Sequence, residues 1–317
     1  MTRAFVFPGQ GAQTIGMGKA LADAYPAAKA VFDEVDAALG ESLSALIWEG
    51  DIETLTLTAN AQPALMATSV AAMRALEAEG LDMVESGAFV AGHSLGEYSA
   101  LCAAGALSVT DTAQLLRARG DAMQSAVPVG EGAMAAILGL PYEKVATAAG
   151  EGASHGVCAA ANDNDPTQVV ISGAKAAVEH AITVAKDMGA KRAMLLPVSA
   201  PFHCDLMEPA ARVMAQKLDA VEMVRPKLPL VANVLAHDVH DTSLIRTLLV
   251  EQVTHRVRWR ESVAWMAEQG VSEIWEIGAG KALSGMIRRI DKSVATRAVG
   301  TPDDVKAAMA ALAEGQA

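Results

Sequence analysis

The sequence contains few cysteines, no long basic segment and no long run of purely apolar residues. Its three cysteines, Cys102, Cys158 and Cys204, are an odd number without the spacing of a metal site, so we expect packed thiols in a reducing compartment and no bound metal. The net charge of −12 leaves no basic stripe that could neutralise phosphates. These features argue against nucleic acid as a partner.

No segment has the length and character of a membrane span or a signal peptide. The longest stretch without a charged residue, 54–73, contains Asn60, Gln62 and Pro63 and predicts a loop followed by a buried helix. The amino terminus leads directly into a short strand and a glycine turn and has no cleavage site. We therefore expect a cytoplasmic protein without a membrane partner, and nothing in the sequence demands more than a monomer.

A serine lies at the centre of the segment around which the chain is organised. Residues 88–91 predict a buried strand, and the spacing of the apolar residues after position 96 predicts a helix. Between them, Gly-His-Ser-Leu-Gly at 92–96 matches the strained strand-to-helix turn that exposes a nucleophilic serine. We interpret Ser94 as that nucleophile, against the alternative of a serine that only caps the helix. The backbone N–H of Leu95 would then point at a developing oxyanion.

A second glycine-rich turn, residues 8–13, follows a predicted strand at 4–7. It does not match the dinucleotide-binding pattern, because Thr14 stands where the third glycine belongs. The Gly-Lys pair at 280–281 likewise fails the pattern of a phosphate-binding loop, and we expect no cofactor. The turn after the first strand either presents the backbone N–H of Gln10 to an oxyanion or is a plain turn.

The order of the predicted elements divides the chain into a large α/β domain and an inserted small domain. Residues 1–127 and 198–317 alternate helices with short apolar strands, which predicts a parallel sheet covered by helices. Residues 128–197 follow the order β-α-β-β-α-β, the ferredoxin-like arrangement. Its expected elements are strands 133–140, 156–161, 168–172 and 191–196 and helices 141–150 and 174–188. The polar run 162–166 is interpreted as a hairpin turn and not as a metal site.

Outside the insertion, one predicted helix carries two arginines of interest. Helix 109–125 contains Arg117 and Arg119, which lie on different faces, and the sequence alone does not identify either as ligand-binding. The other expected elements are helices 17–39, 63–79, 242–253 and 260–269, strands 230–234 and 273–277, a helix after Lys281, and a surface helix after Pro302.

A nucleophilic serine needs a base within hydrogen-bond reach, and seven histidines compete for that role. His203 follows an apolar segment and a proline turn, a position from which a loop could deliver a base. His155 and His180 are weaker candidates, since one lies in a polar loop and the other on an exposed helix face. The remaining competitors are His93, His237, His240 and His255.

Six motifs occur in one order over nearly the whole chain. They are Phe-Pro-Gly-Gln-Gly-Ala-Gln at 7–13, Ala-Gly-His-Ser-Leu-Gly-Glu-Tyr at 91–98, Arg-Gly at 119–120, Gly-Ala-Met-Ala at 132–135, Pro-Val-Ser at 197–199 with His203, and Glu-Ile-Gly-x-Gly-Lys at 276–281. Together they resemble the malonyl-CoA:acyl carrier protein transacylase family. The resemblance implies an α/β-hydrolase-like large domain with a ferredoxin-like small domain.

The resemblance also implies roles for the candidate residues. Ser94 would be the acylated nucleophile and His203 its base, while the backbone N–H groups of Gln10 and Leu95 would form the oxyanion hole. Arg119 would hold the free malonyl carboxylate as a bidentate pair, a geometry that the arginine fork matches and lysine does not.

Two further residues have supporting roles in the resemblance. Gln252 matches the position that supports the histidine, and in this family a main-chain carbonyl replaces the usual triad carboxylate. Phe202 resembles the bulky residue associated with malonyl over methylmalonyl, because a larger side chain leaves less room for a branch. Ala279 replaces the proline that is usual in its loop.

The implied reaction moves the malonyl group from malonyl-CoA to the phosphopantetheine thiol of acyl carrier protein through a malonyl-serine intermediate, supplying fatty acid synthesis. Alternatives are a discrete polyketide-type acyltransferase, a serine esterase with a late histidine such as His255, and a non-catalytic carrier-binding module. Carrier proteins are acidic, so a basic patch should receive one. We favour the pair Lys191 and Arg192 over the other candidates, Arg256, Arg258, Arg260, Arg288 and Arg289.

Overall fold

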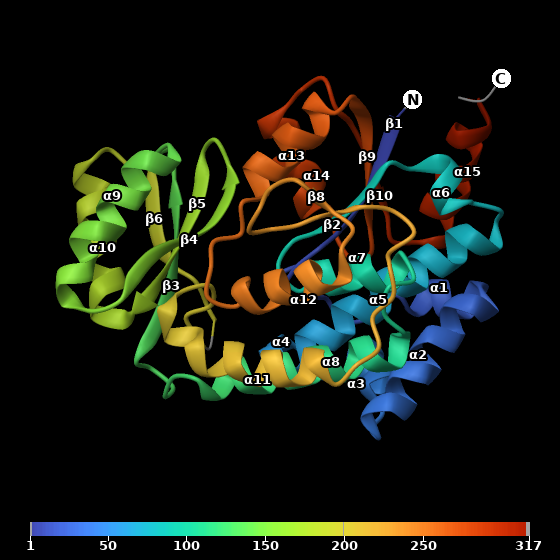
Figure 1. Ribbon diagram of the computed structural model, residues 1–317, viewed down its shortest axis with the longest axis horizontal. Helices are drawn as coiled ribbons and strands as arrows, with labels where there is room; N and C mark the ends of the chain where they lie inside the picture. Colours follow the sequence, from blue (N-terminus) through green and yellow to red (C-terminus); the bar gives the residue numbers. More distant parts are fainter. Residues whose placement is uncertain (1, 199, 315–317) are drawn as a thin grey trace.

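The structure, a computed structural model, describes residues 2–198 and 200–314. Two sheets, each with its own helices, lie side by side (Figure 1). Ser199 of the Pro-Val-Ser motif and both ends of the predicted large domain lie outside the described residues. Among the described helices, none combines the length and the apolar character needed to cross a bilayer.

The larger sheet has six strands in the order β10-β9-β1-β2-β7-β8, and all neighbours are parallel except β7 and β8. Phe7, the last residue of β1, lies opposite Gly92, the last residue of β2. The glycine turn after β1 and the serine turn after β2 therefore meet at one edge of the sheet, where ligands bind in open α/β folds. The strands are β1 (Thr2–Phe7), β2 (Phe89–Gly92), β7 (Leu230–Val231), β8 (Asp238–Val239), β9 (Val271–Ile277) and β10 (Ala295–Val299).

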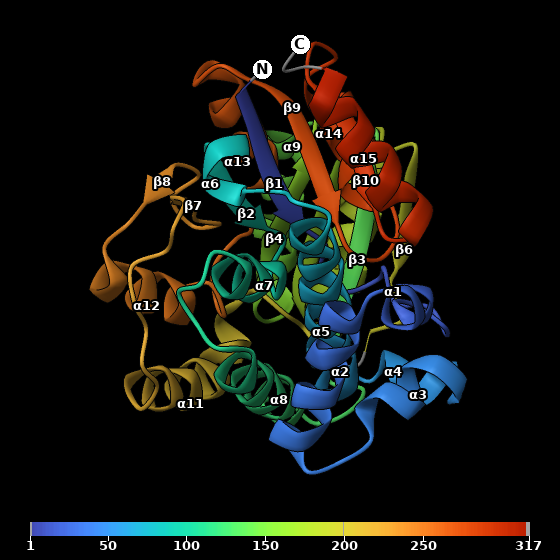
Figure 2. The same ribbon diagram turned by 90° about the vertical axis from the view of Figure 1, so that its right-hand side faces the viewer.

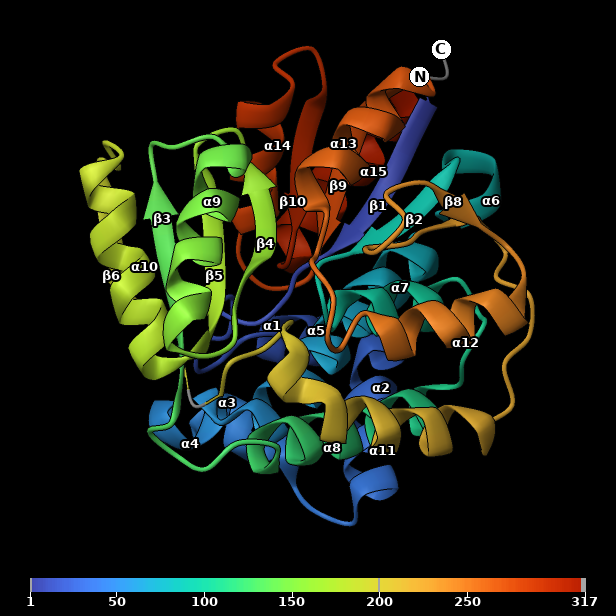
Figure 3. The same cartoon turned by 60° about the vertical axis from the view of Figure 1, so that its left-hand side comes forward.

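Alternate residues of β1 face opposite sides of this sheet. Phe5 and Phe7 belong to the core that includes the buried residues of α5 (Thr58–Ala78), while Ala4 and Val6 pack with residues of α13 (Trp259–Glu268) and α14 (Ala282–Ile290). Helices thus cover both faces, as the alternation of elements predicts (Figure 3).

Most of the other helices of this part pack around the nearly fully buried α5, while α11 packs on α8 and on α12. Figure 2 shows α2 beside α5 and α8. Their bounds are α1 (Lys19–Ala24), α2 (Pro26–Leu39), α3 (Leu43–Glu49), α4 (Ile52–Thr56), α6 (Met83–Ser86), α7 (Gly96–Ala103), α8 (Val109–Ser125), α11 (Glu208–Asp219), α12 (Thr242–Glu251) and α15 (Pro302–Glu314).

The smaller sheet has four antiparallel strands in the order β4-β5-β3-β6, and two helices pack on it. This order and the β-α-β-β-α-β sequence of elements confirm the ferredoxin-like fold class. The precise domain boundaries at 127/128 and 197/198 stay a prediction. The elements are β3 (Gly132–Leu138), α9 (Tyr142–Gly152), β4 (Cys158–Asp165), β5 (Gln168–Ala174), α10 (Lys175–Asp187) and β6 (Arg192–Leu195).

Three local predictions were wrong. The helix expected at 17–39 is two helices, because Pro26 has no N–H and begins a new helix instead of continuing the first. The loop expected before Pro63 is helical, since α4 and the start of α5 occupy it. The run 162–166 is not the turn: β4 continues through Asp165, and the turn consists of Pro166 and Thr167.

Contacts with the larger part explain why this polar run is extended. The N–H of Asp163 donates to the carbonyl of Val257, and the N–H of Val257 donates to the carbonyl of Ala161. These bonds give the backbone of β4 partners outside its own sheet, which no local turn signal reports. The helix α11 and the strand β10 also have no counterpart among the predicted elements.

Candidate active site

Ser94 lies in the tight turn between β2 and α7 with φ at 54°, in the left-handed region that side-chain-bearing residues rarely adopt. Such a conformation costs about 1–3 kcal/mol and persists only where the surroundings enforce it. Both glycines are needed: a Cβ on Gly92 would lie 1.9 Å from the carbonyl carbon of Gly96, and a Cβ on Gly96 would lie 2.2 Å from the carbonyl oxygen of Phe7. The structure therefore contains the strained turn that 92–96 predicts.

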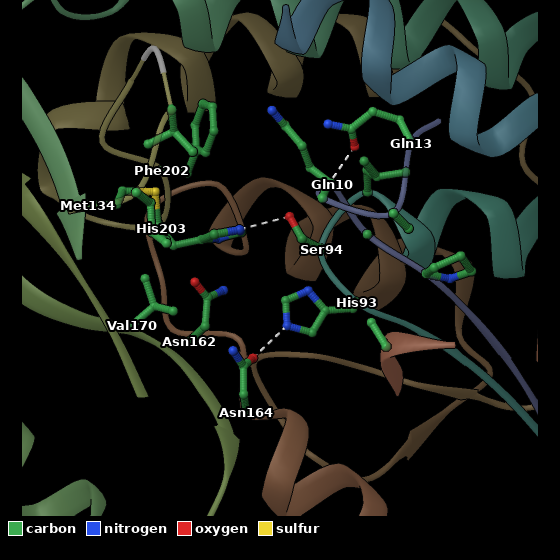
Figure 4. Close-up of a pocket in the computed structure, with 18 of the residues that line it drawn as sticks. Gln10, Gln13, His93, Ser94, Met134, Asn162, Asn164, Val170, Phe202 and His203 are labelled. Atoms are coloured by element: carbon green, nitrogen blue, oxygen red, sulfur yellow. Dashed lines mark hydrogen bonds between the residues drawn. The ribbon is translucent and has the colours of Figure 1, made fainter. Parts of the chain in front are cut away.

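The side chain of His203 reaches Ser94 from a distant part of the chain (Figure 4). The Ser94 hydroxyl lies 2.7 Å from Nε2 of His203, and Nδ1 of His203 lies 2.8 Å from the main-chain oxygen of Gln252. Because a carbonyl oxygen only accepts, we assign the ring proton to Nδ1, which leaves Nε2 to accept the serine proton. The carbonyl occupies the place of the carboxylate in a Ser-His-Asp triad.

The surroundings of His203 keep its ring neutral. Burial, and after it the positive charge of Arg119, lower the pKa of His203 to about 3. Among the described residues that line the cavity, His93 is the other histidine, and its Nε2 lies 2.8 Å from Oδ1 of Asn164. His255, the late histidine of the esterase hypothesis, bonds to the carbonyl of Glu251 and does not line this cavity.

Two backbone N–H groups border the cavity beside Ser94, those of Gln10 and Leu95. Within the described residues, neither group donates to a protein acceptor. The N–H of Ser94 itself is not available, because it donates to Oδ1 of Asn233 over 2.9 Å. The pairing of β1 with β2 brings the turn of Gln10 next to the serine turn, and this juxtaposition is what an oxyanion hole requires.

Arg119 of α8 points into the same site and is only 1% exposed. Its Nη1 donates to Oε1 of Gln62 over 2.7 Å, and its Nη2 donates to Oε1 of Gln252 over 2.7 Å and to Oγ of Ser94 over 3.1 Å. Among the described residues, no carboxylate forms an ion pair with this guanidinium. Arg117 faces the other way and contacts Asn60 and Glu41.

Beneath the serine turn lies a hydrogen-bonded group that the sequence analysis did not find. Glu97 accepts hydrogen bonds from the backbone N–H of Asn233 and from Nε2 of Gln252, which also donates to the carbonyl of Ser94. Burial raises the pKa of Glu97 to about 7, against the opposing effect of these bonds. Glu97 occurs in the quoted motif, but Asn233 is 136 residues further along the chain and carries no local signal.

These groups open onto one cavity of about 550 Å³ between the two sheets. All seven predicted site residues are brought together there, although Gln252 contacts the site from behind His203 and Arg119 and is not part of the cavity wall. Phe202 forms part of the wall, next to residues of β3 and β5 (Figure 4). The wall also contains two amides of β4, Asn162 and Asn164, that the sequence analysis assigned to a turn.

Comparison with known proteins places this geometry in a family. The family model described as acyl transferase domain matches residues 4–304. The malonyl CoA-acyl carrier protein transacylase of Bacillus subtilis (strain 168) is 46% identical over 312 residues, which cover 98% of this chain and 97% of that protein. The protein of the same name from Escherichia coli (strain K12) is 45% identical, with 96% of this chain and 98% of that protein covered.

Solved structures of similar proteins belong to the same family. The acyl-carrier-protein-S-malonyltransferase from Bartonella henselae has a TM-score of 0.97 at 55% identity and covers 99% of this chain, which in turn covers 100% of it. A malonyl-transacylase in complex with its type II PKS acyl-carrier protein has a TM-score of 0.94 at 42% identity, with coverages of 97% and 99%. Matches of this extent show that the chain belongs to the malonyl-CoA:acyl carrier protein transacylase family of acyltransferases.

Proposed function

We propose that this chain transfers the malonyl group of malonyl-CoA to the phosphopantetheine thiol of acyl carrier protein through a malonyl ester of Ser94, and so supplies fatty acid synthesis. The observation that carries the proposal is the buried guanidinium of Arg119, 3.1 Å from the nucleophilic oxygen and without a carboxylate partner among the described residues. A buried charge needs a counter-ion. The free carboxylate of a malonyl group supplies one at the right place.

In the first half-reaction, Nε2 of His203 takes the proton of the Ser94 hydroxyl while Oγ attacks the thioester carbon. The carbonyl oxygen becomes an oxyanion, which the backbone N–H groups of Gln10 and Leu95 stabilise. The tetrahedral intermediate collapses, the carbon–sulfur bond breaks, and the coenzyme A sulfur leaves with the proton held by His203. The product is malonyl-Ser94.

The second half-reaction runs the same steps with the carrier as nucleophile. His203 takes the proton of the phosphopantetheine thiol, the sulfur attacks the malonyl ester, and the carbon–oxygen bond to Ser94 breaks. The proton then returns to Oγ, and the free enzyme is restored. The depressed pKa of His203 keeps its ring neutral before each attack.

Two residues would select the acyl group. Arg119 favours acyl groups that carry a carboxylate, since acetyl leaves its buried charge without a counter-ion. Phe202, 8% exposed in the cavity wall, would restrict branching next to the carbonyl.

A serine esterase fits this site less well. In a serine esterase, the carboxylate of an acidic residue would bond to Nδ1 of the catalytic histidine, but here the main-chain carbonyl of Gln252 occupies that position. An esterase also has no use for Arg119. A polyketide-type acyltransferase is the second candidate, because one structural relative was solved with a type II PKS acyl-carrier protein. Transfer rates to a fatty-acid carrier and to a polyketide carrier would separate these two pathways.

An acidic carrier would dock at the start of β6. Lys191 and Arg192 are exposed and have no ion-pair partner among the described residues, and the chain that follows them lines the cavity at Leu196. The other candidates are mostly neutralised, since acidic side chains pair with Arg256, Arg258, Arg260 and Arg289.

We propose the cytoplasm as the compartment, since it keeps thiols reduced. Within the described residues, Cys102, Cys158 and Cys204 are unbridged. One chain supplies all the groups of the mechanism, so the proposal needs only a monomer, and it involves no membrane.

Intact-protein mass tests the proposed function. Wild-type protein mixed with malonyl-CoA should gain one malonyl group, the Ser94→Ala variant should gain none, and phosphopantetheinylated carrier should remove the adduct and become malonylated. An adduct that only water removes, while the carrier stays unloaded, would favour the esterase. No adduct at all would leave a carrier-binding module.

A further inference from the structure

The carboxamide of Asn162 is a polar group in the cavity wall to which the mechanism above gives no role. Asn162 lies on β4, is 6% exposed and forms part of the wall of the cavity that contains Ser94 and His203. In Figure 4 its amide points toward the side of the cavity where His203 lies, between Val170 and His93.

The neighbours of Asn162 on β4 all have partners. The carboxylate of Asp163 pairs with Arg260 at 2.9 Å, the side-chain Oδ1 of Asn164 lies 2.8 Å from Nε2 of His93, and the carboxylate of Asp165 pairs with Arg289 at 2.8 Å. The side chain of Asn162 alone bonds to no other described residue. Its amide lines the cavity that contains Ser94 and has no protein partner among the described residues, so its donors and its acceptor are available to a ligand in that cavity.

The backbone of Asn162 is held in place. β4 pairs with β5 on one side, and on the other side Asn162 bridges to Val257, with bonds of 2.9 Å from the N–H of Asp163 and 2.8 Å to the carbonyl of Ala161. The register with β5 shifts between Ala160 and Asn162, an irregularity of the kind that re-aims side chains. A rigid backbone makes the amide a pre-organised binding group and not a mobile surface side chain.

The chemistry of the substrates identifies the partner. Of the malonyl thioester, the carboxylate is matched by Arg119 and the carbonyl oxygen by the N–H groups of Gln10 and Leu95. In both the malonyl donor, coenzyme A, and the acceptor, the carrier, the next polar group along the arm is the amide two methylenes from the sulfur. A carboxamide offers both an acceptor and two donors and can therefore bind the N–H and the C=O of such an amide.

We propose that Asn162 binds the amide of the phosphopantetheine arm that lies closest to the sulfur, and so positions the sulfur against Ser94. The inference rests on the proposed function. Arg119 comes from α8 and Asn162 from the smaller sheet, so the acyl end and the thiol end of the substrate are held by different parts of the molecule. Since coenzyme A and the carrier share this arm, Asn162 serves both half-reactions.

The test compares two thioesters that differ in this amide alone. Malonyl-N-acetylcysteamine contains it, whereas the malonyl thioester of pentanethiol has a chain of equal length without it. The rate of malonyl-Ser94 formation at low substrate concentration is measured by intact mass for wild type, Asn162→Ala and Asn162→Leu, the last being similar in volume and apolar. Gln269→Ala, which removes an exposed amide far from the cavity, is the matched control.

Both Asn162 variants should lose about 10-fold or more on malonyl-N-acetylcysteamine, as expected for lost hydrogen bonds, and less than about 2-fold on the pentanethiol ester. Gln269→Ala should match wild type on both. Equal losses on the two thioesters, or none on either, would overturn the inference while leaving the proposed function intact. If wild type forms no adduct with malonyl-CoA, the proposed function fails, and this inference fails with it.

Discussion

Replacing Arg119 should abolish the preference for malonyl over acetyl. In the proposed complex the guanidinium forms two charge-assisted hydrogen bonds with the malonyl carboxylate, each worth about 1.5–3 kcal/mol. Losing both raises the barrier by about 3–6 kcal/mol, which is a factor of about 10²–10⁴ in kcat/KM for malonyl-CoA. Acetyl-CoA has no carboxylate and loses none of this energy.

The hydrogen bonds of Arg119 within the protein determine how much the substitution also slows the transfer of acetyl. In Arg119→Ala, Oε1 of Gln62 and Oε1 of Gln252 lose donors 2.7 Å away, and the Ser94 oxygen loses one at 3.1 Å. Transfer of acetyl should therefore fall as well, but by a smaller factor. Arg119→Lys keeps the charge and loses the planar fork, so its selectivity should lie between wild type and alanine.

The assay is the steady-state kcat/KM for malonyl-CoA and for acetyl-CoA with holo carrier as acceptor. Arg117→Ala is the matched control, because this arginine lies two residues away on the same helix and contacts Asn60 and Glu41 outside the site. If malonyl and acetyl transfer fall by the same factor in Arg119→Ala, the guanidinium supports Ser94 and Gln252 and does not recognise the carboxylate.

Two buried acid–base groups and the docking surface give the remaining predictions. His203 has a pKa of about 3 in the folded protein, below its ordinary value near 6.5. Its contribution to stability is therefore present above about pH 6.5 and is lost as the pH falls toward 3. His203→Gln should weaken the decrease of Tm over this acid range. Glu97 has a folded pKa of about 7, so its contribution is lost as pH rises from about 4.5 through 7; Glu97→Gln should flatten Tm over this range, and an unchanged slope would contradict its burial as an acid. Lys191→Glu with Arg192→Glu should raise KM for carrier about 10-fold at low salt and leave Ser94 malonylation unchanged. Arg212→Glu, at an exposed position of α11, is the control and should change neither KM for carrier nor malonylation; a rise in KM equal to that of the double variant would indicate an effect of net charge alone.

Local sequence patterns predicted the parts of the site that depend on neighbouring residues. The Gly-x-Ser-x-Gly spacing identifies the strained turn at Ser94, because Gly92 and Gly96 must approach each other within the turn itself. The close approach of Gly96 to the carbonyl of Phe7 is a further requirement, which only the packing of the turn on β1 reveals. The turn at Gln10 was visible but ambiguous, because its use depends on the pairing of β1 with β2. The resemblance to a family predicts that the N–H of Gln10 serves an oxyanion hole and favours Arg119 over Arg117, a choice that periodicity could not make.

Other predictions failed because distant contacts decide them. The polar run 162–166 has the composition of a turn, but Val257, Arg260 and Arg289 supply partners that keep it extended. No local signal relates these residues, which lie about a hundred positions apart. The supporting group of Glu97 and Asn233 was missed for the same reason.

Sequence patterns were enough to predict the fold class, the candidate nucleophile Ser94 and, through the motifs, the family, because each is carried by residues that are close together or occur in a fixed order. The tertiary structure shows which N–H groups stay unpaired among the described residues, which carbonyl stands in the place of the triad acid, and which buried arginine has no carboxylate partner there. These properties depend on burial and on hydrogen bonds between segments far apart in the chain, such as the contact of His203 with Ser94 across 109 residues. A sequence pattern reports neither burial nor unsatisfied hydrogen-bonding groups, and in this protein those properties distinguish a transferase site from an esterase site.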